Sequence, residues 1–473
     1  MRTSLLATLT ISLLTVAARA EPPSEKEAAD ALRKAITFYR TRVASHGGYV
    51  WRYSADLAKR EGEGAVGLDT VWVQPPGTPA VGLAYLDAYR ATGEKEYLEA
   101  AREAARVLLR GQLRSGGWTA RIDLGPKERG KLAYRDEPVR AKARNVTSLD
   151  DDMTQAALRF LIQLDQALDF KDKKIHEAVE YALASLLKAQ YPIGAWPQGY
   201  TDVPEMAEMP VRRARFPETW SRTYQGHNRY WRFYTLNDNT LVDTLEVLLL
   251  AGRVYERRDC RAAALKAADF LLLAQLPAPQ PAWAQQYDFE MQPTWARKFE
   301  PPAVSGSESQ RVLQTLLMLY DLTGEKKYLD AVKPGLDYLK KSRLPDGRLA
   351  RFYELKTNRP LYFTRDYQLT DKADDLPTHY GFIVDSKLDG IEREYERLVK
   401  EGPSKQAAVH KPRARGVLGG RARAVIDALD ERGAWVEEGK LRFHGKADPT
   451  TRIIEGRTFL RNVEILTEFL RSE

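Results

Sequence analysis

The stretch that decides the fold is YLDAYRATGEKEYLEAAREAARVLL, residues 85–109, in which two helix patterns flank a short polar break. Apolar residues recur at helical spacing on both sides of the break, which predicts two helices packed side by side as a hairpin. The stretch LMLYDLTGEKKYLDAVKPGLDYL, residues 317–339, repeats this pattern with nearly the same break. Two copies so far apart in the chain indicate a repeat of helical hairpins.

Weaker copies of the hairpin occupy residues 161–187 and 247–275. Each second helix leads to a loop with glycine or an aromatic residue, such as LRSGGWTA, YPIGAWPQ, APQPAWAQQYD and LPDGRLARFYE. Glycine allows the tight turn, and the aromatic residue beside it falls at the same end of every hairpin. The sequence therefore predicts an all-α fold, an α/α toroid built as an incomplete barrel of repeated hairpins with long aromatic-rich loops. An open solenoid is the alternative architecture.

Residues 1–20 have the pattern of a secretory signal peptide, with a basic start at Arg2, an apolar run and an Ala-Arg-Ala end. We expect it to be cleaved, and no other run approaches the roughly twenty apolar residues of a membrane span. The expected location is secreted or periplasmic. We predict one toroid domain over residues 21–473, in which 401–455 is a loop excursion and 456–473 a closing helix.

Composition narrows the partners of the chain. Its 473 residues carry a net charge of +8, which for an exported protein favours an acidic polysaccharide or an anionic envelope over nucleic acid. The single cysteine, Cys260, excludes an internal disulfide, so stability must come from a large core. We expect a monomer whose one thiol is structural.

Two helix patterns begin with polar clusters. NVTSLDDDMTQAALRFLIQL, residues 145–164, carries Asp150, Asp151 and Asp152, and YTLNDNTLVDTLEVLLLA, residues 234–251, carries Asn237, Asp238 and Asn239. Such residues can cap a helix and suit its dipole. Alternatively, carboxylate and amide oxygens from both clusters converge on a hard cation such as calcium. The calcium-loop pattern of an EF-hand is absent, so distant segments would have to build that site.

Three further stretches, residues 189–200, 280–310 and 347–367, are rich in arginine and aromatic residues. Trp and Tyr on turns provide flat faces for sugar rings, and Arg offers a planar fork that matches a carboxylate. An aromatic residue is more often part of the core, but this density on loops at one end of the repeats favours a sugar-acid surface.

The stretches SLDDDMTQAALRFL, AQYPIGAWPQ, TLNDNTLVDTL, WAQQYDFEMQPTWARKFEPPAVSGSES and ARFYELKTNRPLYFTRD resemble the pectate lyases of polysaccharide lyase family 10. The resemblance covers residues 68–398 in the family's order. It implies an α/α toroid that cleaves polygalacturonate by calcium-assisted β-elimination. It also implies calcium ligands at Asp150, Asp151 and Asp238, with Asn237 as second choice, although Asp150-Asp151-Asp152 stands where the family has an Asp-Asn pair.

The resemblance implies an arginine as the catalytic base, and Arg297 is the position that matches best. A guanidinium pKa above about 12 opposes this role unless clustered cations and burial lower it. The substrate-binding residues that we expect are three arginines as carboxylate clamps and four aromatic residues: Arg351, Arg359, Arg365, Trp196, Tyr287, Trp295 and Tyr353.

Two rival functions stay open at this point. Many α/α toroids hydrolyse glycans with two carboxylates, and Asp150 with Asp238 could form that pair. The scaffold could also belong to a non-catalytic envelope protein that binds carbohydrate. A zinc site is disfavoured, because no two of the six histidines have metal-ligand spacing on a helix.

Overall fold

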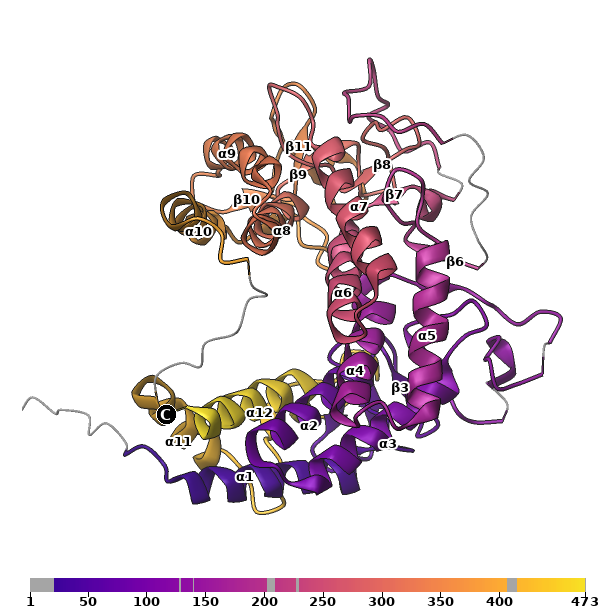
Figure 1. Ribbon diagram of the computed structural model, residues 1–473, viewed down its shortest axis with the longest axis vertical. Coiled ribbons are helices and arrows are strands. Elements are labelled where there is room, and N and C mark those ends of the chain that lie inside the picture. Colours follow the sequence, from indigo (N-terminus) through magenta and orange to yellow (C-terminus); the bar gives the residue numbers. More distant parts are fainter. Residues whose placement is uncertain are drawn as a thin grey trace, which may run out of the picture.

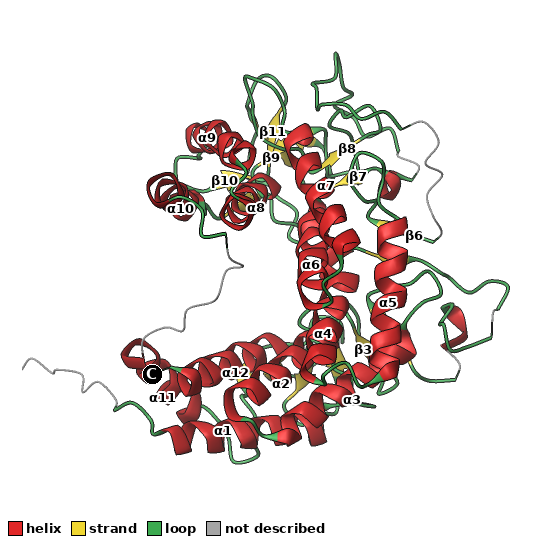
Figure 2. Cartoon of the chain, viewed as in Figure 1, coloured by secondary structure: helices red, strands yellow, loops and turns green. Residues whose placement is uncertain are grey.

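A computed structural model describes residues 21–126, 129–138, 140–201, 209–226, 229–405 and 415–472. The predicted signal peptide, residues 1–20, lies outside these ranges. In the described chain, helical hairpins follow one another around an open ring, with short strands confined to the loops (Figures 1 and 2). The predicted all-α, α/α toroid is thus confirmed. None of the described helices has the length and apolar character needed to cross a bilayer.

Two sets of helices alternate along the chain. The outer set is α1 (Glu25–Phe38), α3 (Lys95–Gly111), α5 (Lys173–Lys188), α7 (Arg258–Ala274), α9 (Lys326–Lys341) and α11 (Arg415–Asp427). The inner set is α2 (Thr78–Thr92), α4 (Met153–Ala167), α6 (Thr240–Val254), α8 (Glu308–Thr323), α10 (Leu388–Glu401) and α12 (Gly456–Arg471). Inner helices pack on their neighbours from α2 to α10, and α12 packs back on α2 and α1. The ring therefore opens between α10 and the α11–α12 pair (Figure 1).

The repeated Thr-Gly-Glu-Lys break has the same structure in both copies. Gly93 and Gly324 end α2 and α8 with φ of 75° and 74°, a left-handed conformation in which glycine has no Cβ clash. The backbone N–H of each glycine binds the carbonyl of the tyrosine four residues earlier. Identical sequence breaks thus make identical helix ends, as the repeat predicts.

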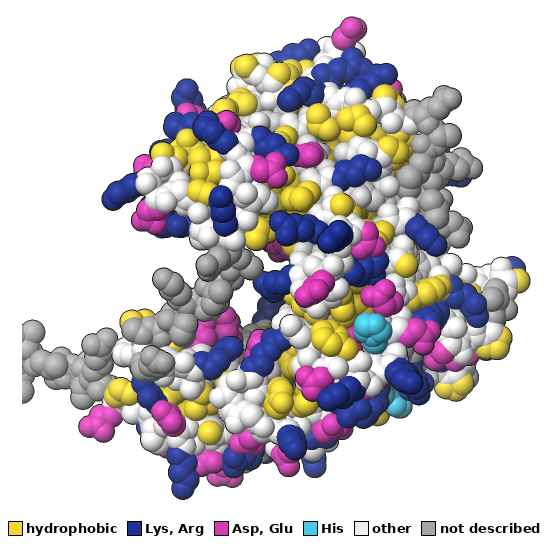
Figure 3. Space-filling view, in the orientation of Figure 1, with side chains coloured by type: hydrophobic (Ala, Val, Ile, Leu, Met, Phe, Trp, Pro, Cys, Tyr) yellow, Lys and Arg dark blue, Asp and Glu magenta, His cyan; other side chains and the backbone are white. Residues whose placement is uncertain are grey.

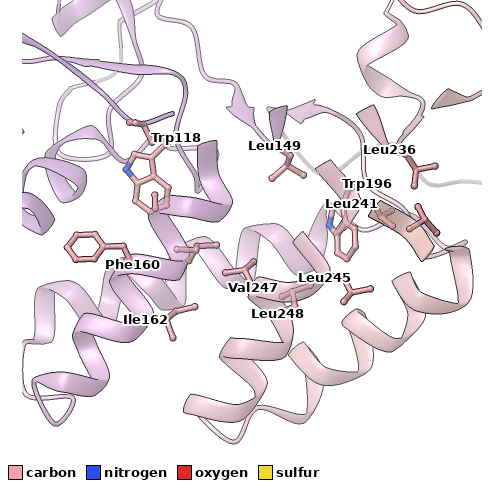
Figure 4. Packing of buried hydrophobic residues seen from close by; sticks show 14 of the residues in the cluster. Trp118, Leu149, Phe160, Ile162, Trp196, Leu236, Leu241, Leu245, Val247 and Leu248 are labelled. Atoms are coloured by element: carbon pink, nitrogen blue, oxygen red, sulfur yellow. The ribbon is translucent and has the colours of Figure 1, made fainter. Parts of the chain in front are cut away.

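The loops after the outer helices share a tryptophan latch. In the loops after α3, α5, α7 and α11, a buried indole Nε1–H donates to a carbonyl in the last turn of the preceding helix, where helix geometry leaves carbonyls without partners. The four bonds are Trp118 to Leu108 at 2.8 Å, Trp196 to Leu186 at 2.8 Å, Trp283 to Leu271 at 2.7 Å and Trp435 to Val425 at 2.9 Å. Figure 4 shows two of these indoles among buried apolar side chains. The latch fixes where each long loop leaves its helix.

Antiparallel strand pairs then join one loop to another. The two-stranded sheets pair β3 (Thr70–Trp72) with β4 (Arg121–Asp123), β5 (Thr147–Ser148) with β6 (Gly199–Tyr200), β7 (Tyr234–Thr235) with β8 (Gln286–Tyr287), and β10 (Leu349–Ala350) with β14 (Ile383–Val384). A four-stranded sheet has the order β13 (Leu369–Thr370), β12 (Pro360–Phe363), β11 (Phe352–Glu354), β9 (Ala303–Ser305). These links hold the starts of α4, α6 and α8 side by side.

The segment 415–455 packs against the N-terminal region. A second four-stranded sheet has the order β15 (Glu437–Glu438), β16 (Arg452–Glu455), β1 (Arg52–Ser54), β2 (Arg60–Glu61). Buried Glu61 accepts hydrogen bonds from the backbone N–H groups of Arg442 and Phe443 and pairs with Arg52 at 2.9 Å. The described part of 401–455 therefore contains α11 and two strands, β15 and β16, and β16 pairs with β1.

Charged side chains are spread over the surface. In Figure 3 lysine and arginine alternate with aspartate and glutamate across the visible face of the ring. The excess positive charge of +8 is therefore not gathered into a single basic patch on that face. Cys260 is fully buried in α7, and burial raises the pKa of its thiol to about 12, as expected of a structural cysteine.

Removal of one latch tests its contribution to stability. Trp196→Phe keeps an aromatic ring but leaves the Leu186 carbonyl without its donor, so the free energy of unfolding falls by about 2 kcal/mol. Trp196→Ala also opens a cavity and lowers it by about 4 kcal/mol. Urea unfolding measures both. The control Trp231→Phe, at an indole that is 45% exposed, changes it by less than about 0.5 kcal/mol. Equal effects at both tryptophans would contradict the latch.

Candidate cation and substrate site

The two acidic clusters form matching turns at the starts of α4 and α6. In the short helical turns Asp150–Asp152 and Asn237–Asn239, the middle and last residues have positive φ, between 47° and 60°. Asp and Asn tolerate this left-handed conformation better than other residues with a Cβ, but it still costs energy. No side-chain cap bond is formed at either helix start. Helix capping therefore does not account for these residues.

The turns bring carboxylates from both helix starts together. Ligand oxygens of Asp150, Asp151 and Asp238 lie within 4.8 Å of one another. Gln74 donates to Asp151 at 2.9 Å, and Asn237 donates to Asp238 at 2.6 Å. Oδ1 of Asp150 and Oδ1 of Asn237 are buried without a hydrogen-bond partner. The predicted convergence of two distant helix starts is thus present, with acceptor oxygens left over.

The cluster is electrostatically unfavourable on its own. Burial, followed by repulsion from Asp151 and Asp150, raises the pKa of Asp238 to about 8. Burial and the charge of Asp150 raise the pKa of Asp151 to about 6, and burial raises that of Asp150 as well. Close carboxylates with spare oxygens are the donor set that a hard divalent cation such as calcium prefers. The residues present therefore fit the predicted cation.

Asp152, the third acid of the run, is separate from this set. It pairs with Arg159 through two bonds of 2.9 and 3.2 Å. The extra carboxylate relative to the family pattern thus has its own counter-charge.

Arg297 is anchored beside the cluster by a buried glutamate. Its Nε and Nη2 donate to the two carboxylate oxygens of Glu300 at 2.7 and 2.5 Å, and the side chain of Glu300 is only 2% exposed. Burial works to lower the pKa of Arg297, but the bonds and charge of Glu300 outweigh it and raise that pKa well above its usual value. The arrangement keeps the guanidinium protonated, which opposes the role of base that the resemblance implies.

Arg351 approaches from another loop and lacks such a bidentate partner. Its Nε donates to the Gly381 carbonyl at 2.8 Å, and its Nη1 donates to the Tyr380 hydroxyl at 3.1 Å. The nearest carboxylate oxygen in an ion pair, on Glu308, is 3.6 Å from Nη1. The guanidinium is nevertheless close enough to lower the pKa of Asp238. Arg351 therefore contributes positive charge to the same site.

The other two predicted clamps have partners of their own. Arg359 pairs with Glu354 at 2.9 Å, and Arg365 pairs with Asp375 at 3.2 Å. Their side chains are 62% and 71% exposed, so both guanidinium groups face solvent on the 351–365 loop.

The four predicted aromatic platforms lie in the interior. Trp196, Tyr287 and Tyr353 are essentially unexposed, and Trp295 is 7% exposed. The Tyr287 hydroxyl binds the Ala274 carbonyl, and the other three also donate to backbone carbonyls. These rings anchor loops to the core and have no free face for a sugar.

Several site residues were not identified from the sequence. Glu300 lies three residues after Arg297 in the quoted motif, a spacing that could have suggested an ion pair. Gln74 and Tyr380 lie within the range of the resemblance but outside the stretches quoted for it. Trp231, which exposes 45% of its surface, accepts a backbone bond from Gln198, whose side chain in turn contacts Asp150.

The raised carboxylate pKa values predict an unusual pH dependence of stability. The pKa values of Asp151 and Asp238 rise from 3.8 to about 6 and about 8, so the folded protein binds more protons than the unfolded chain between these values. The free energy of unfolding therefore falls as pH increases from about 4 to about 8, by several kcal/mol, since one unit of pKa shift corresponds to about 1.4 kcal/mol. Calcium raises the melting temperature more at pH 8 than at pH 5. Calorimetry in EDTA and in calcium measures this, and Asp238→Asn, the control, flattens the pH slope and loses the calcium shift. A calcium shift unchanged in Asp238→Asn would contradict the site.

Comparison with known proteins agrees with these features. Residues 125–346 match the family model for pectic acid lyase, and no curated protein matches the sequence significantly. Among solved structures, a mutant family 10 polysaccharide lyase from Cellvibrio cellulosa in complex with trigalacturonic acid has a TM-score of 0.45 and 20% identity, over 68% of this chain and 98% of that chain. A cellobiose 2-epimerase from Bacillus thermoamylovorans has a TM-score of 0.48 and 14% identity, over 94% of this chain and 98% of that chain. The segment 125–346, which includes both acidic turns and Arg297, is therefore similar to the pectic acid lyase family.

Proposed function

We propose that this protein is a polysaccharide lyase that cleaves polygalacturonate by β-elimination, with calcium held by Asp150, Asp151 and Asp238 and supported by Asn237. The observation that carries the proposal is the convergence of two acidic helix starts beside two guanidinium groups. Both kinds of group are needed. The aspartates would hold the calcium ion, and the calcium ion and the arginines would bind the carboxylate of the substrate.

The chemistry of the substrate explains the arrangement. The C5 proton of a galacturonate unit is acidic only when the charge of the neighbouring C6 carboxylate is neutralised. A calcium ion bound to the three aspartates would neutralise part of that charge. Arg297 and Arg351 supply further positive charge, which stabilises the enolate-like transition state. The C5–H bond then breaks, the electrons form the C4=C5 double bond, and the C4 glycosidic oxygen leaves.

A base must accept the C5 proton. The carboxylate partner of each arginine indicates which guanidinium is held in the protonated form. We assign charge stabilisation to Arg297, because its bidentate bond with Glu300 favours the protonated form. Arg351 is assigned to charge stabilisation as well, so we place the base on the 351–365 segment at Arg359 or Arg365. Neither of these two has a bidentate bond with a carboxylate as fully buried as that of Glu300.

The third carboxylate of the cluster favours a cation over the hydrolase alternative. Hydrolases of glycosidic bonds work with two carboxyl groups, one on each side of the scissile bond. Here Asp151 joins Asp150 and Asp238 in one cluster, with ligand oxygens within 4.8 Å of one another, which suits a common cation.

We further propose that the protein is exported, acts as a monomer and forms one catalytic domain.

Product analysis tests the proposal directly. Polygalacturonate treated with the protein should gain the ultraviolet absorbance of an unsaturated uronide, and EDTA should abolish this gain. Asp238→Ala should raise the calcium concentration needed for half-maximal rate by about tenfold or more, because one carboxylate ligand is lost. New reducing ends without absorbance would instead indicate a hydrolase. An unchanged calcium requirement would remove Asp238 from the cation site.

Substitution of the arginines tests their roles. Arg297→Lys keeps the charge but loses the planar fork, so kcat/KM should fall about a hundredfold while galacturonate oligomers still bind. Of Arg359→Lys and Arg365→Lys, the variant without the base should no longer exchange the substrate C5 proton with deuterium from solvent. Arg102→Lys, on the outer helix α3, serves as the control and should be fully active. Full activity of Arg297→Lys would remove that residue from the site.

A further inference from the structure

A chain of hydrogen bonds connects the two site arginines through Tyr380. Nη1 of Arg351 donates to the Tyr380 hydroxyl at 3.1 Å, and this hydroxyl donates to Oε1 of Glu300 at 3.0 Å. The same oxygen accepts Nη2 of Arg297 at 2.5 Å. A neutral phenol and a buried carboxylate thus stand between the two cations, which reduces the repulsion between the guanidinium groups.

The Tyr380 ring contributes as well as its hydroxyl. The guanidinium carbon of Arg351 lies 4.5 Å from the ring centroid, and that of Arg297 lies 5.7 Å from it. Phe299 and Phe382 hold the ring from other sides, with centroids at 4.8 and 5.2 Å. A ring packed this closely cannot move without moving the two arginines.

The surroundings of the Tyr380 hydroxyl keep it protonated and able to connect Arg351 with Glu300 by hydrogen bonds. Burial and the charge of Glu300 raise the pKa of Tyr380 well above its usual value. The phenol therefore keeps its proton and can donate a hydrogen bond to Glu300. The Gln285 carbonyl oxygen lies 3.2 Å from the same hydroxyl. Tyr380 lies beyond the segment that matches the pectic acid lyase family, in a loop that returns to the site next to β14.

We infer that Tyr380 is a positioning residue that sets the spacing of Arg297 and Arg351 for the substrate carboxylate. This inference rests on the proposed elimination. In this role Tyr380 acts through the two guanidinium groups. Phenylalanine at this position would keep the ring faces but break the hydrogen-bond chain between Arg351 and Glu300.

A double-mutant cycle tests this role against a merely structural one. Tyr380→Phe should lower kcat/KM on polygalacturonate about tenfold, and the same change in an Arg351→Lys background should lower it less than twofold, because the bridged group is already absent. The calcium-induced rise in melting temperature should be the same in Tyr380→Phe as in the parent. Tyr85→Phe, which removes a buried phenol from α2, is the control and should leave kcat/KM unchanged.

A second measurement does not depend on turnover. In protein labelled with ¹⁵N-arginine, the Nη1 proton of Arg351 that is bonded to the Tyr380 hydroxyl, identified by its loss in Arg351→Lys, should exchange with solvent at least tenfold faster in Tyr380→Phe. Additive effects in the cycle, or unchanged exchange of this proton, would overturn the inference. If the parent protein eliminates no polyuronate, the proposed function fails, whereas the exchange rate still decides whether Tyr380 holds Arg351.

Discussion

Repulsion between three partly buried carboxylates is the constraint on which the rest of the structure depends. Asp150, Asp151 and Asp238 share a site in which ionisation of one opposes ionisation of the others. Such an arrangement persists only when the surrounding chain leaves the side chains no other place. Four residues in left-handed conformations aim the carboxylates, and the packing of α4 against α6 prevents the two turns from separating.

Two arginines near this cluster provide positive charge and are themselves held by hydrogen bonds and ion pairs. Arg297 and Arg351 each have an acidic neighbour outside the aspartate cluster, Glu300 and Glu308. These glutamates limit the directions in which each guanidinium can still bind an acid, which is a property that recognition of a sugar acid requires.

The sequence predicts the scaffold better than the surface of the site. The Thr-Gly-Glu-Lys breaks and the Gly-aromatic loops follow from local chemistry, and so did the two acidic helix starts. The aromatic residues were misleading, because a tryptophan next to glycine has the same pattern whether its ring stacks on a sugar or its N–H closes a helix end, as Trp196 does. Tyr380 could not be found this way, since its partners are 29 and 80 residues distant in the chain and no spacing rule relates them.

The strand order β15-β16-β1-β2 has a consequence for how the ring is assembled. The first strands of the chain obtain their partner, β16, from its last part, and α2 obtains its neighbour α12 only there. The edge of β1 and one flank of α2 therefore stay uncovered during folding until β16 and α12 have docked, which requires contacts between segments about 400 residues apart in sequence. A chain that lacks β16 would expose an unpaired β edge, which favours aggregation.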